Sequence, residues 1–258
     1  SKTGTIHVLA VSGLHVGIIY LLLSGLLLMK KSKGRSLKLK SLVILLSLFA
    51  YCLLTGFAPS VSRASIMFGV VVIAKAFQRR SNIYNTLSFA CFLLLVINPF
   101  NLYNVGFQFS FLAVLGIVYY KDSFRKRMPV SSYLGDKVAT LLSVSLAAQI
   151  TTFPIGLYYF HQYPNLFMIS NLIVIPCITV ILYLGILFVL VVPFSDMLAK
   201  LCAKAVTLYI DFIAMVVHFL QDIPYAFFED VHITLVQMLS IYGFILLTTI
   251  SIKHKSKV

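Results

Sequence analysis

Two histidines, a serine and two glycines stand close together in the first apolar stretch of this sequence, which reads HVLAVSGLHVG. His7, Ser12 and His15 can donate or accept hydrogen bonds. Gly13 and Gly17 are four positions apart, a spacing that lets a second helix approach closely. The polar groups either bond to neighbouring helices or face a common hydrated cavity. The sequence offers no third ligand beside His7 and His15, so it does not predict a metal site there.

A single arginine lies in another apolar stretch, within the string PSVSRA. Pro59 and Ser60 favour a helix start, where free backbone amides carry a partial positive charge. Arg63 follows one turn later, and its guanidinium could bind a phosphate through two parallel hydrogen bonds. It could equally pair with a buried carboxylate, for which Asp211 is one candidate. Both interpretations stay open.

Amide and hydroxyl side chains recur at helical spacing further along the chain. Asn104 and Gln108 are four positions apart, Gln149 and Thr152 are three apart, and Asn171 precedes a proline by five positions. Polar groups are costly at membrane depth and therefore face other helices or water. Ordinary interhelical hydrogen bonds explain each stripe alone. Several stripes in one bundle, together with proline interruptions, instead suggest a hydrated central path.

Apolar helices must position these residues, because 60% of the 258 residues are hydrophobic, 11% are charged and the mean hydropathy is +0.99. A soluble domain carries roughly a quarter charged residues, so soluble enzymes, extracellular disulfide scaffolds and disordered chains are excluded. Blocks near the length of a membrane span, about 20 residues, predict an all-α, polytopic transmembrane helical bundle of eight or nine spans. It forms a single domain over residues 1–258, with helices kinked or broken at prolines such as Pro176. The nine blocks are Ile6–Met29, Leu39–Phe57, Val61–Phe77, Ile83–Ile97, Val105–Tyr120, Val138–Phe160, Leu166–Val192, Met197–Leu220 and Ile233–Ile252.

The net charge of +14 is explained by membrane topology and does not by itself indicate a nucleic-acid-binding surface. With nine crossings and Ser1 outside, nearly all Lys and Arg residues fall in inner loops, as is usual for cytoplasmic loops. The eighth block, Met197–Leu220, carries a polar stripe. It therefore either crosses the membrane or lies in the membrane interface.

Motifs for catalysis or for a cofactor are missing from the sequence. The P-loop, HExxH and GxSxG patterns do not occur, and the four cysteines are scattered through apolar blocks. We therefore expect no enzyme activity, no cofactor and no metal. Energy for directed transport would come from another protein or from the membrane potential. Because the chain does not begin with Met, we expect it to be a fragment of a longer protein.

Several strings, in the same order, are similar to those of the ComEC-type competence membrane domain. HVLAVSGLHV at residues 7–16 is the most specific and is close to that family's HLLAISGLHV. PSVSRA at 59–64 resembles its PSxxRA segment, and GFQFSFLA at 106–113 resembles its GFQLSFLA. Segments 149–154 and 171–176 match in their Gln, Asn and Pro positions. The resemblance extends over nearly the whole chain.

This resemblance implies a channel in the bacterial cytoplasmic (inner) membrane for uptake of single-stranded DNA during natural competence and transformation. The implied partners are single-stranded DNA, the lipid bilayer and other competence-machinery proteins, including a cytoplasmic motor, and a homo-oligomer is possible. Full members of the family also carry OB-like and metallo-β-lactamase-like nuclease domains. The HxHxDH motif of that nuclease is missing here, so the fragment would be the channel part without a soluble nuclease domain. An outer nuclease after the last helix requires an even number of spans, whereas the basic C-terminal tail favours nine.

Two other functions stay open. One is a secondary transporter for a small anionic solute, built from the same interrupted helices, and the other is a structural membrane anchor. Under the channel hypothesis, two sets of side chains line or shape the DNA path. The main set is Ser12, Gly13, His15, Arg63, Gln108, Gln149 and Asn171, and the secondary set is His7, Ser60, Asn104, Thr152 and Asp211.

Overall fold

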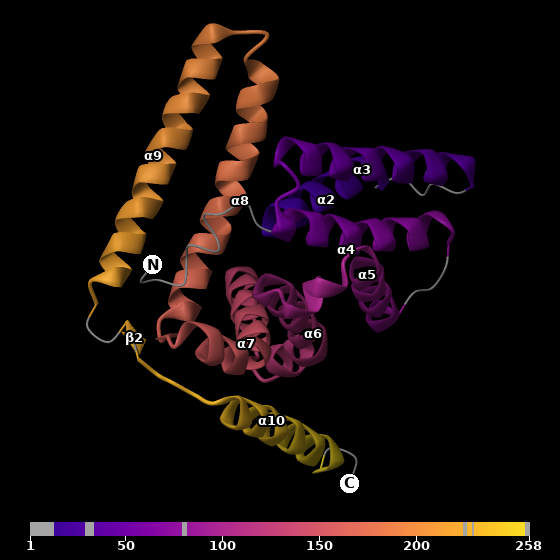
Figure 1. The fold of residues 1–258 in the computed structure, drawn as a ribbon. Coiled ribbons are helices and arrows are strands. Elements are labelled where there is room, and N and C mark those ends of the chain that lie inside the picture. Colours follow the sequence, from indigo (N-terminus) through magenta and orange to yellow (C-terminus); the bar gives the residue numbers. More distant parts are fainter. Residues whose placement is uncertain (1–12, 29–33, 79–81, 224–225, 229, 256–258) are drawn as a thin grey trace.

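Helices make up most of the protein in the computed structural model, which describes residues 13–28, 34–78, 82–223, 226–228 and 230–255 (Figure 1). Besides the helices, these residues hold one pair of two-residue strands, β1 (Tyr163–Pro164) and β2 (Phe227–Phe228), and a short 3-10 helix (Pro99–Tyr103). The all-α prediction is thereby confirmed. The α-helices are α2 (Gly13–Leu28), α3 (Arg35–Leu54), α4 (Pro59–Ala76), α5 (Ile83–Ile97), α6 (Val105–Lys126), α7 (Tyr133–Phe160), α8 (Phe167–Val191), α9 (Asp196–Gln221) and α10 (Leu235–Lys255).

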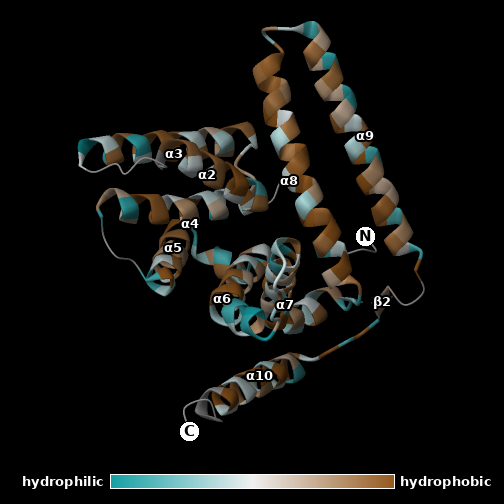
Figure 2. Cartoon of the chain, turned by 180° about the vertical axis from the view of Figure 1, so that it is seen from behind, coloured by the Kyte–Doolittle hydropathy of each residue, from teal (hydrophilic) through white to brown (hydrophobic). Residues whose placement is uncertain are grey.

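Each predicted apolar block corresponds to one of these helices. Six of them, α3, α4, α7, α8, α9 and α10, are long and apolar enough to cross a membrane, and α2 and α5 are shorter apolar helices. Large apolar side chains lie on the outside, where Leu54, Phe194 and Met197 are 85%, 87% and 83% exposed, and Figure 2 shows hydrophobic residues along the outer faces of the helices. Apolar surface of this extent is typical of contact with lipid or another protein.

Polar residues between the blocks determine where several helices begin. The side chains of Asn82, Asn104 and Ser132 each accept a hydrogen bond from a backbone N–H in the first turn of α5, α6 and α7. At the start of α10, Thr234 and Gln237 bond each other's backbone N–H in a capping box. These bonds satisfy amides that have no partner inside the helix. The caps therefore fix the helix starts within an otherwise uniformly apolar sequence.

Helices α2, α3 and α4 pack together as one group. Their shared core holds the buried side chains Val16, Ile44, Leu48, Val61 and Val72. From this group the chain continues through α5 to α6, and α6 packs extensively against α7. Helix α4 also contacts α6, so this helix joins the first group to the α6–α7 pair.

Helices α8 and α9 form a long hairpin that extends away from the other helices (Figure 1). Val174, Cys177, Ile178, Ile213 and Val217 are buried between them. Strands β1 and β2 pair antiparallel, so the chain entering α8 lies beside the chain leaving α9. The two helices have 25 and 26 residues, roughly 38 Å each at about 1.5 Å per residue. A crossing by α8 therefore requires a return crossing by α9, which favours the membrane-crossing interpretation of the eighth block over the interfacial one.

The prolines in the interior of α7 and α8 do not interrupt these helices. Helix α7 is continuous through Pro154, and α8 is continuous through Pro176. A proline inside a helix removes one backbone hydrogen bond, and here the remaining bonds on both sides keep each helix in one piece. Of the two predicted outcomes for Leu166–Val192, a kink or a break at Pro176, the continuous helix α8 excludes the break.

Two tyrosines attach the last helix to the α6–α7 pair. The Tyr242 hydroxyl donates to the backbone oxygen of Thr151 at 2.8 Å, and the hydroxyls of Tyr120 and Thr249 lie 2.8 Å apart. We expect Tyr242→Phe to lower the free energy of unfolding by about 1 kcal/mol, because it removes one hydrogen bond. Thermal melting of the purified protein measures the loss. Tyr183→Phe is the control, since Tyr183 is 45% exposed on α8, and equal melting of both variants would contradict the role given to Tyr242.

Candidate functional site

Arg63 is buried where α4 meets α6. Its side chain lies in the second turn of α4, the residue is only 9% exposed, and its Nε donates to the Ser110 hydroxyl of α6 at 3.2 Å. Ser110 in turn donates to the backbone oxygen of Gly106 at 2.7 Å. The guanidinium is thus held against the first turns of α6.

The start of α6 is shaped to accept this guanidinium. A Cβ atom on Gly106 would lie 3.0 Å from Nη2 of Arg63 and 3.2 Å from Oδ1 of Asn104. Asn104 uses that oxygen to cap the helix, accepting from the N–H of Phe107 at 3.0 Å. We call Arg63, Asn104, Gly106 and Ser110 the Arg63 cluster.

The Arg63 cluster holds one cation and, within the described ranges, no acid that pairs with it. Among the residues that the structure describes, Arg125 and Asp136 form the ion pair, and Arg63 has no carboxylate partner. The amino end of α6 adds the partial positive charge of its helix dipole. A buried guanidinium beside a helix amino end attracts anions, and phosphate is the anion that such groups bind best.

Asp211 is not the partner of Arg63. It is exposed on α9, a helix that packs chiefly against α8, whereas Arg63 faces α6. The carboxylate interpretation of Arg63 therefore finds no support among the described residues. The physical reason is the α8–α9 hairpin, which carries Asp211 away from α4.

Close packing of α2 on α4 places Gly13, which belongs to the described end of the first predicted string, near the Arg63 cluster. A Cβ on Gly13 would lie 3.2 Å from the Cβ of Ala64 and 3.8 Å from the backbone oxygen of Ser60. The helix approach predicted from the Gly13 and Gly17 spacing is thereby formed. His15 is half-buried on α2 and takes part in contacts of its own. Ser12 and His7 lie outside the described residues.

The amide residues are distributed over three helices. Gln108 turns back toward the 3-10 helix, where its Nε2 donates to the oxygen of Leu102 at 2.8 Å, and its Oε1 is buried without a partner. Gln149 is half-buried on α7, and Asn171 is half-buried on α8. Thr152 donates to the oxygen of Ala148 in its own helix at 2.9 Å. No hydrogen bond within the described ranges joins these four side chains to the Arg63 cluster.

Two important contacts involve residues that were not among the predicted sites. Ser110 is the hydrogen-bond partner of Arg63, and its signal in the sequence is the four-residue spacing from Gly106. Thr151, next to the predicted Thr152, donates to the oxygen of Leu112 across the α6–α7 contact at 2.7 Å. Thr151 and Thr152 differ only in the side of α7 that they face, because adjacent residues on a helix point about 100° apart.

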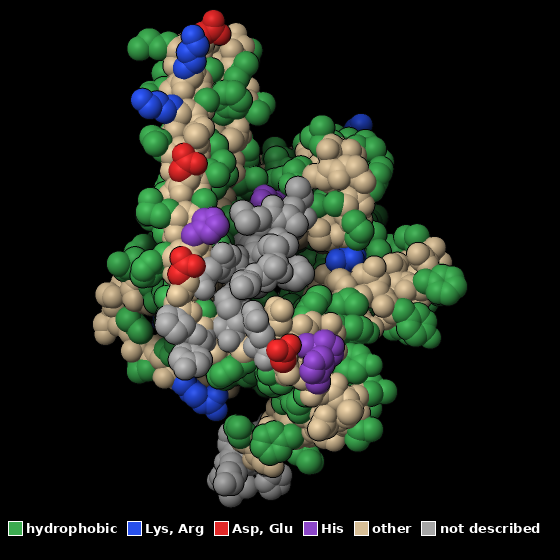
Figure 3. All heavy atoms as spheres, turned by 60° about the vertical axis from the view of Figure 1, so that its left-hand side comes forward, with side chains coloured by type: hydrophobic (Ala, Val, Ile, Leu, Met, Phe, Trp, Pro, Cys, Tyr) green, Lys and Arg blue, Asp and Glu red, His purple; other side chains and the backbone are tan. Residues whose placement is uncertain are grey.

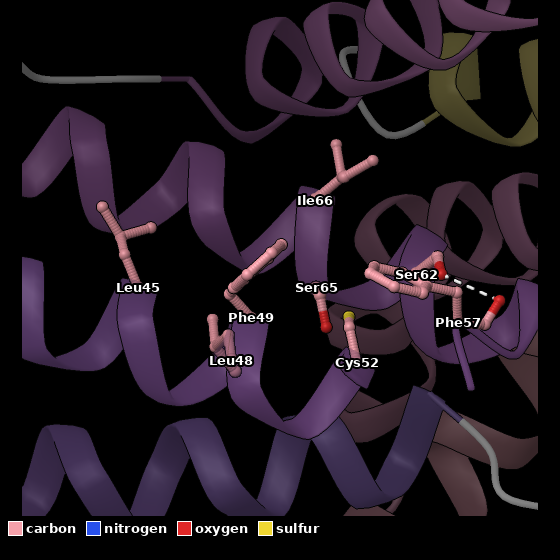
Figure 4. Close-up of a pocket in the computed structure, with 8 residues that line it drawn as sticks. All are labelled: Leu45, Leu48, Phe49, Cys52, Phe57, Ser62, Ser65 and Ile66. Atoms are coloured by element: carbon pink, nitrogen blue, oxygen red, sulfur yellow. Dashed lines mark hydrogen bonds between the residues drawn. The ribbon is translucent and has the colours of Figure 1, made fainter. Parts of the chain in front are cut away.

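A cavity of about 300 Å³ opens between α3 and α4, on a face of α4 that does not include Arg63 (Figure 4). The Ser62 hydroxyl at its edge donates to the oxygen of Phe57 at 3.2 Å, and the Ser65 hydroxyl is buried without a hydrogen-bond partner. The lining is mostly apolar, so this cavity is not the hydrated path expected from the sequence. It is lined by Leu45, Leu48, Phe49, Cys52, Phe57, Ser62, Ser65 and Ile66.

Comparison with known proteins places this chain in a family. The family described as Competence protein matches residues 1–255. ComE operon protein 3 of Bacillus subtilis (strain 168) is 36% identical over 178 residues, which are 69% of this chain and 22% of that protein. An uncharacterized protein of Aquifex aeolicus (strain VF5) is 35% identical over 153 residues, which are 59% of this chain and 33% of that protein. The matched regions thus cover no more than a third of either relative, and no solved structure shows a significant match. With its apolar helices and a family match over almost its full length, this multi-pass membrane protein belongs to the competence protein family.

Proposed function

We propose that this chain is the membrane part of a channel that takes up single-stranded DNA across the bacterial cytoplasmic membrane during transformation. The observation that carries the proposal is the Arg63 cluster, a buried guanidinium beside a helix amino end with no carboxylate partner among the described residues. Membership of the competence family supports a role in DNA uptake. The similarity to ComE operon protein 3 supports the same role.

The chemistry of the Arg63 cluster suits transient contact with a phosphate backbone. A single strand presents one negative charge per nucleotide, and neutralising a phosphate releases counterions. One guanidinium and the amides of one helix end attract a phosphate as it passes. The site also stays weak enough for release, as conduction requires. A larger cluster of cations would hold the strand in place.

The other predicted path residues belong to this proposal as well. Gly13 of α2 packs against Ser60 of α4 near the Arg63 cluster, and Gln108 offers a buried amide oxygen two residues beyond Gly106. We propose that Gln149 and Asn171 extend the path along α7 and α8. The remaining partners are a cytoplasmic motor, other competence proteins and a second copy of the chain. We assign this chain transport and no catalytic step.

Translocation of DNA into liposomes tests the proposal. The full-length protein that contains this chain is reconstituted, and entry of a fluorescent single strand is compared with entry of a duplex and with protein-free liposomes. We expect single-strand entry that falls as salt rises, with a slope of about −0.7 per phosphate contact on logarithmic axes. If the protein takes up a small labelled anion and DNA does not change that uptake, the transporter hypothesis replaces the channel hypothesis. If neither DNA nor the anion is transported, the structural membrane anchor is the function that remains.

A further inference from the structure

Two histidine rings contact each other where two connecting segments meet. His161 follows the last turn of α7, and His232 precedes α10. Their ring centroids are 4.3 Å apart, with the ring planes inclined by 44°. On the face shown in Figure 3, histidine side chains lie against one another at the protein surface. The DNA path proposed above does not use this pair.

The backbone holds the two rings in place. His161 adopts a left-handed conformation with φ 55°, and its oxygen accepts from the N–H of Val231 at 3.0 Å. Close by, the β1–β2 pair and a 3.0 Å bond from the N–H of Asn165 to the oxygen of Ala226 join the same two segments. The two connecting segments are therefore held side by side before any ligand binds, which lowers the conformational entropy lost on binding.

Histidine is the side chain that most often binds metal ions. The Nδ1 atom of His161 is buried without a hydrogen-bond partner, whereas His232 is exposed and accessible to an ion from solution. An unpaired buried polar atom carries a desolvation cost that a bond would relieve. Imidazole nitrogens prefer zinc, copper and nickel.

We propose that His161 and His232 form a two-imidazole site for a divalent transition-metal ion. In the part of the chain that the structure describes, no third His, Cys, Asp or Glu completes a ligand group. Water therefore fills the remaining positions, and the ion binds with the affinity of a two-ligand site. Cu²⁺ should bind more tightly than Ni²⁺ or Zn²⁺. A bound ion would clamp the α7–α8 connection to the α9–α10 connection and so fix the position of α10.

Copper binding to the full-length protein tests this site. The protein is purified through a tag that contains no histidine, and bound Cu²⁺ is followed by electron paramagnetic resonance. Compared with wild type, His161→Gln and His232→Gln should each lose one Cu²⁺ whose signal shows two nitrogen ligands. His218→Gln, which removes an exposed histidine on α9, should retain it. The measured quantity is the difference in bound Cu²⁺ between wild type and each variant. Metal bound elsewhere in the full-length protein is the same in all of them and therefore does not contribute to this difference.

A stability measurement provides an independent readout. Zn²⁺ and Cu²⁺ should raise the melting temperature of wild type and of His218→Gln, and should leave His161→Gln and His232→Gln unchanged. Melting without metal checks that all variants fold. Equal copper occupancy in the four proteins would overturn the proposal, as would a wild-type spectrum without two-nitrogen coordination. A His161→Gln variant that fails to fold still leaves the exposed His232→Gln variant as the deciding comparison.

Discussion

Replacing Arg63 with Leu is expected to reduce DNA uptake by roughly ten- to a hundredfold, because a hydrogen bond to a charged group is worth about 1.5–3 kcal/mol. Arg63 is the buried cation of the Arg63 cluster, and its Nε is held by Ser110. Leu places an apolar side chain at this position and so removes the positive charge. Transformation frequency in a competent host that carries the full-length gene measures the effect, after normalisation to protein level in the membrane.

Two further variants separate charge from geometry at the same place. Arg63→Lys keeps the positive charge and loses the planar fork, so uptake should fall by less than with Leu. Gly106→Ala places a Cβ 3.0 Å from Nη2 of Arg63 and should lower uptake by displacing the guanidinium. Arg127→Leu is the matched control, because Arg127 is exposed at the far end of α6. Normal transformation by Arg63→Leu at normal protein level would remove the proposed phosphate contact.

The helices could be predicted from the sequence because the signal for each is local. Apolar blocks of membrane length require helices, since backbone groups in lipid must be bonded within the segment. The block Ile83–Ile97 has the same bounds as α5. Some helices extend beyond their apolar block, because charged or polar residues continue the helix past the membrane core. Helix α6, for example, runs on to Lys126, whereas the apolar block ends at Tyr120.

The contacts between helices could be predicted only in part. The Gly13 and Gly17 spacing indicated a close helix approach, and α4 occupies that position. The spacing of residues does not reveal which helix a polar side chain contacts, however. The sequence therefore left two possible partners for Arg63, a phosphate and the Asp211 carboxylate. That choice depends on the α8–α9 hairpin and on the pairing of β1 with β2, which join segments far apart in the sequence. The grouping of Gln149 and Asn171 with Arg63 stays a prediction for the same reason.

The α6–α7 contact leads to the second large expected effect, at Gly116. A Cβ on this glycine would lie 2.2 Å from Oγ1 of Thr151 and 2.4 Å from the backbone oxygen of Ala147. Gly116→Ala must therefore push α7 away from α6 and weaken the bond from Thr151 to the oxygen of Leu112. Overpacking costs about 1–3 kcal/mol and a lost hydrogen bond about 1 kcal/mol. We expect a loss of about 3 kcal/mol in the free energy of unfolding, measured by melting and by protein level in the membrane.

Gly185→Ala is the matched control, because a Cβ on Gly185 meets nothing within 4 Å and alanine favours a helix over glycine by about 1 kcal/mol. It should melt at or above the wild-type temperature. Combining Gly116→Ala with Thr151→Ala identifies the atom responsible, since it removes the side-chain clash and leaves the backbone oxygen of Ala147 in place. The double variant should therefore regain only part of the lost stability. Full recovery would assign the whole effect to the Thr151 side chain, and wild-type stability of Gly116→Ala alone would contradict the close approach of α6 and α7.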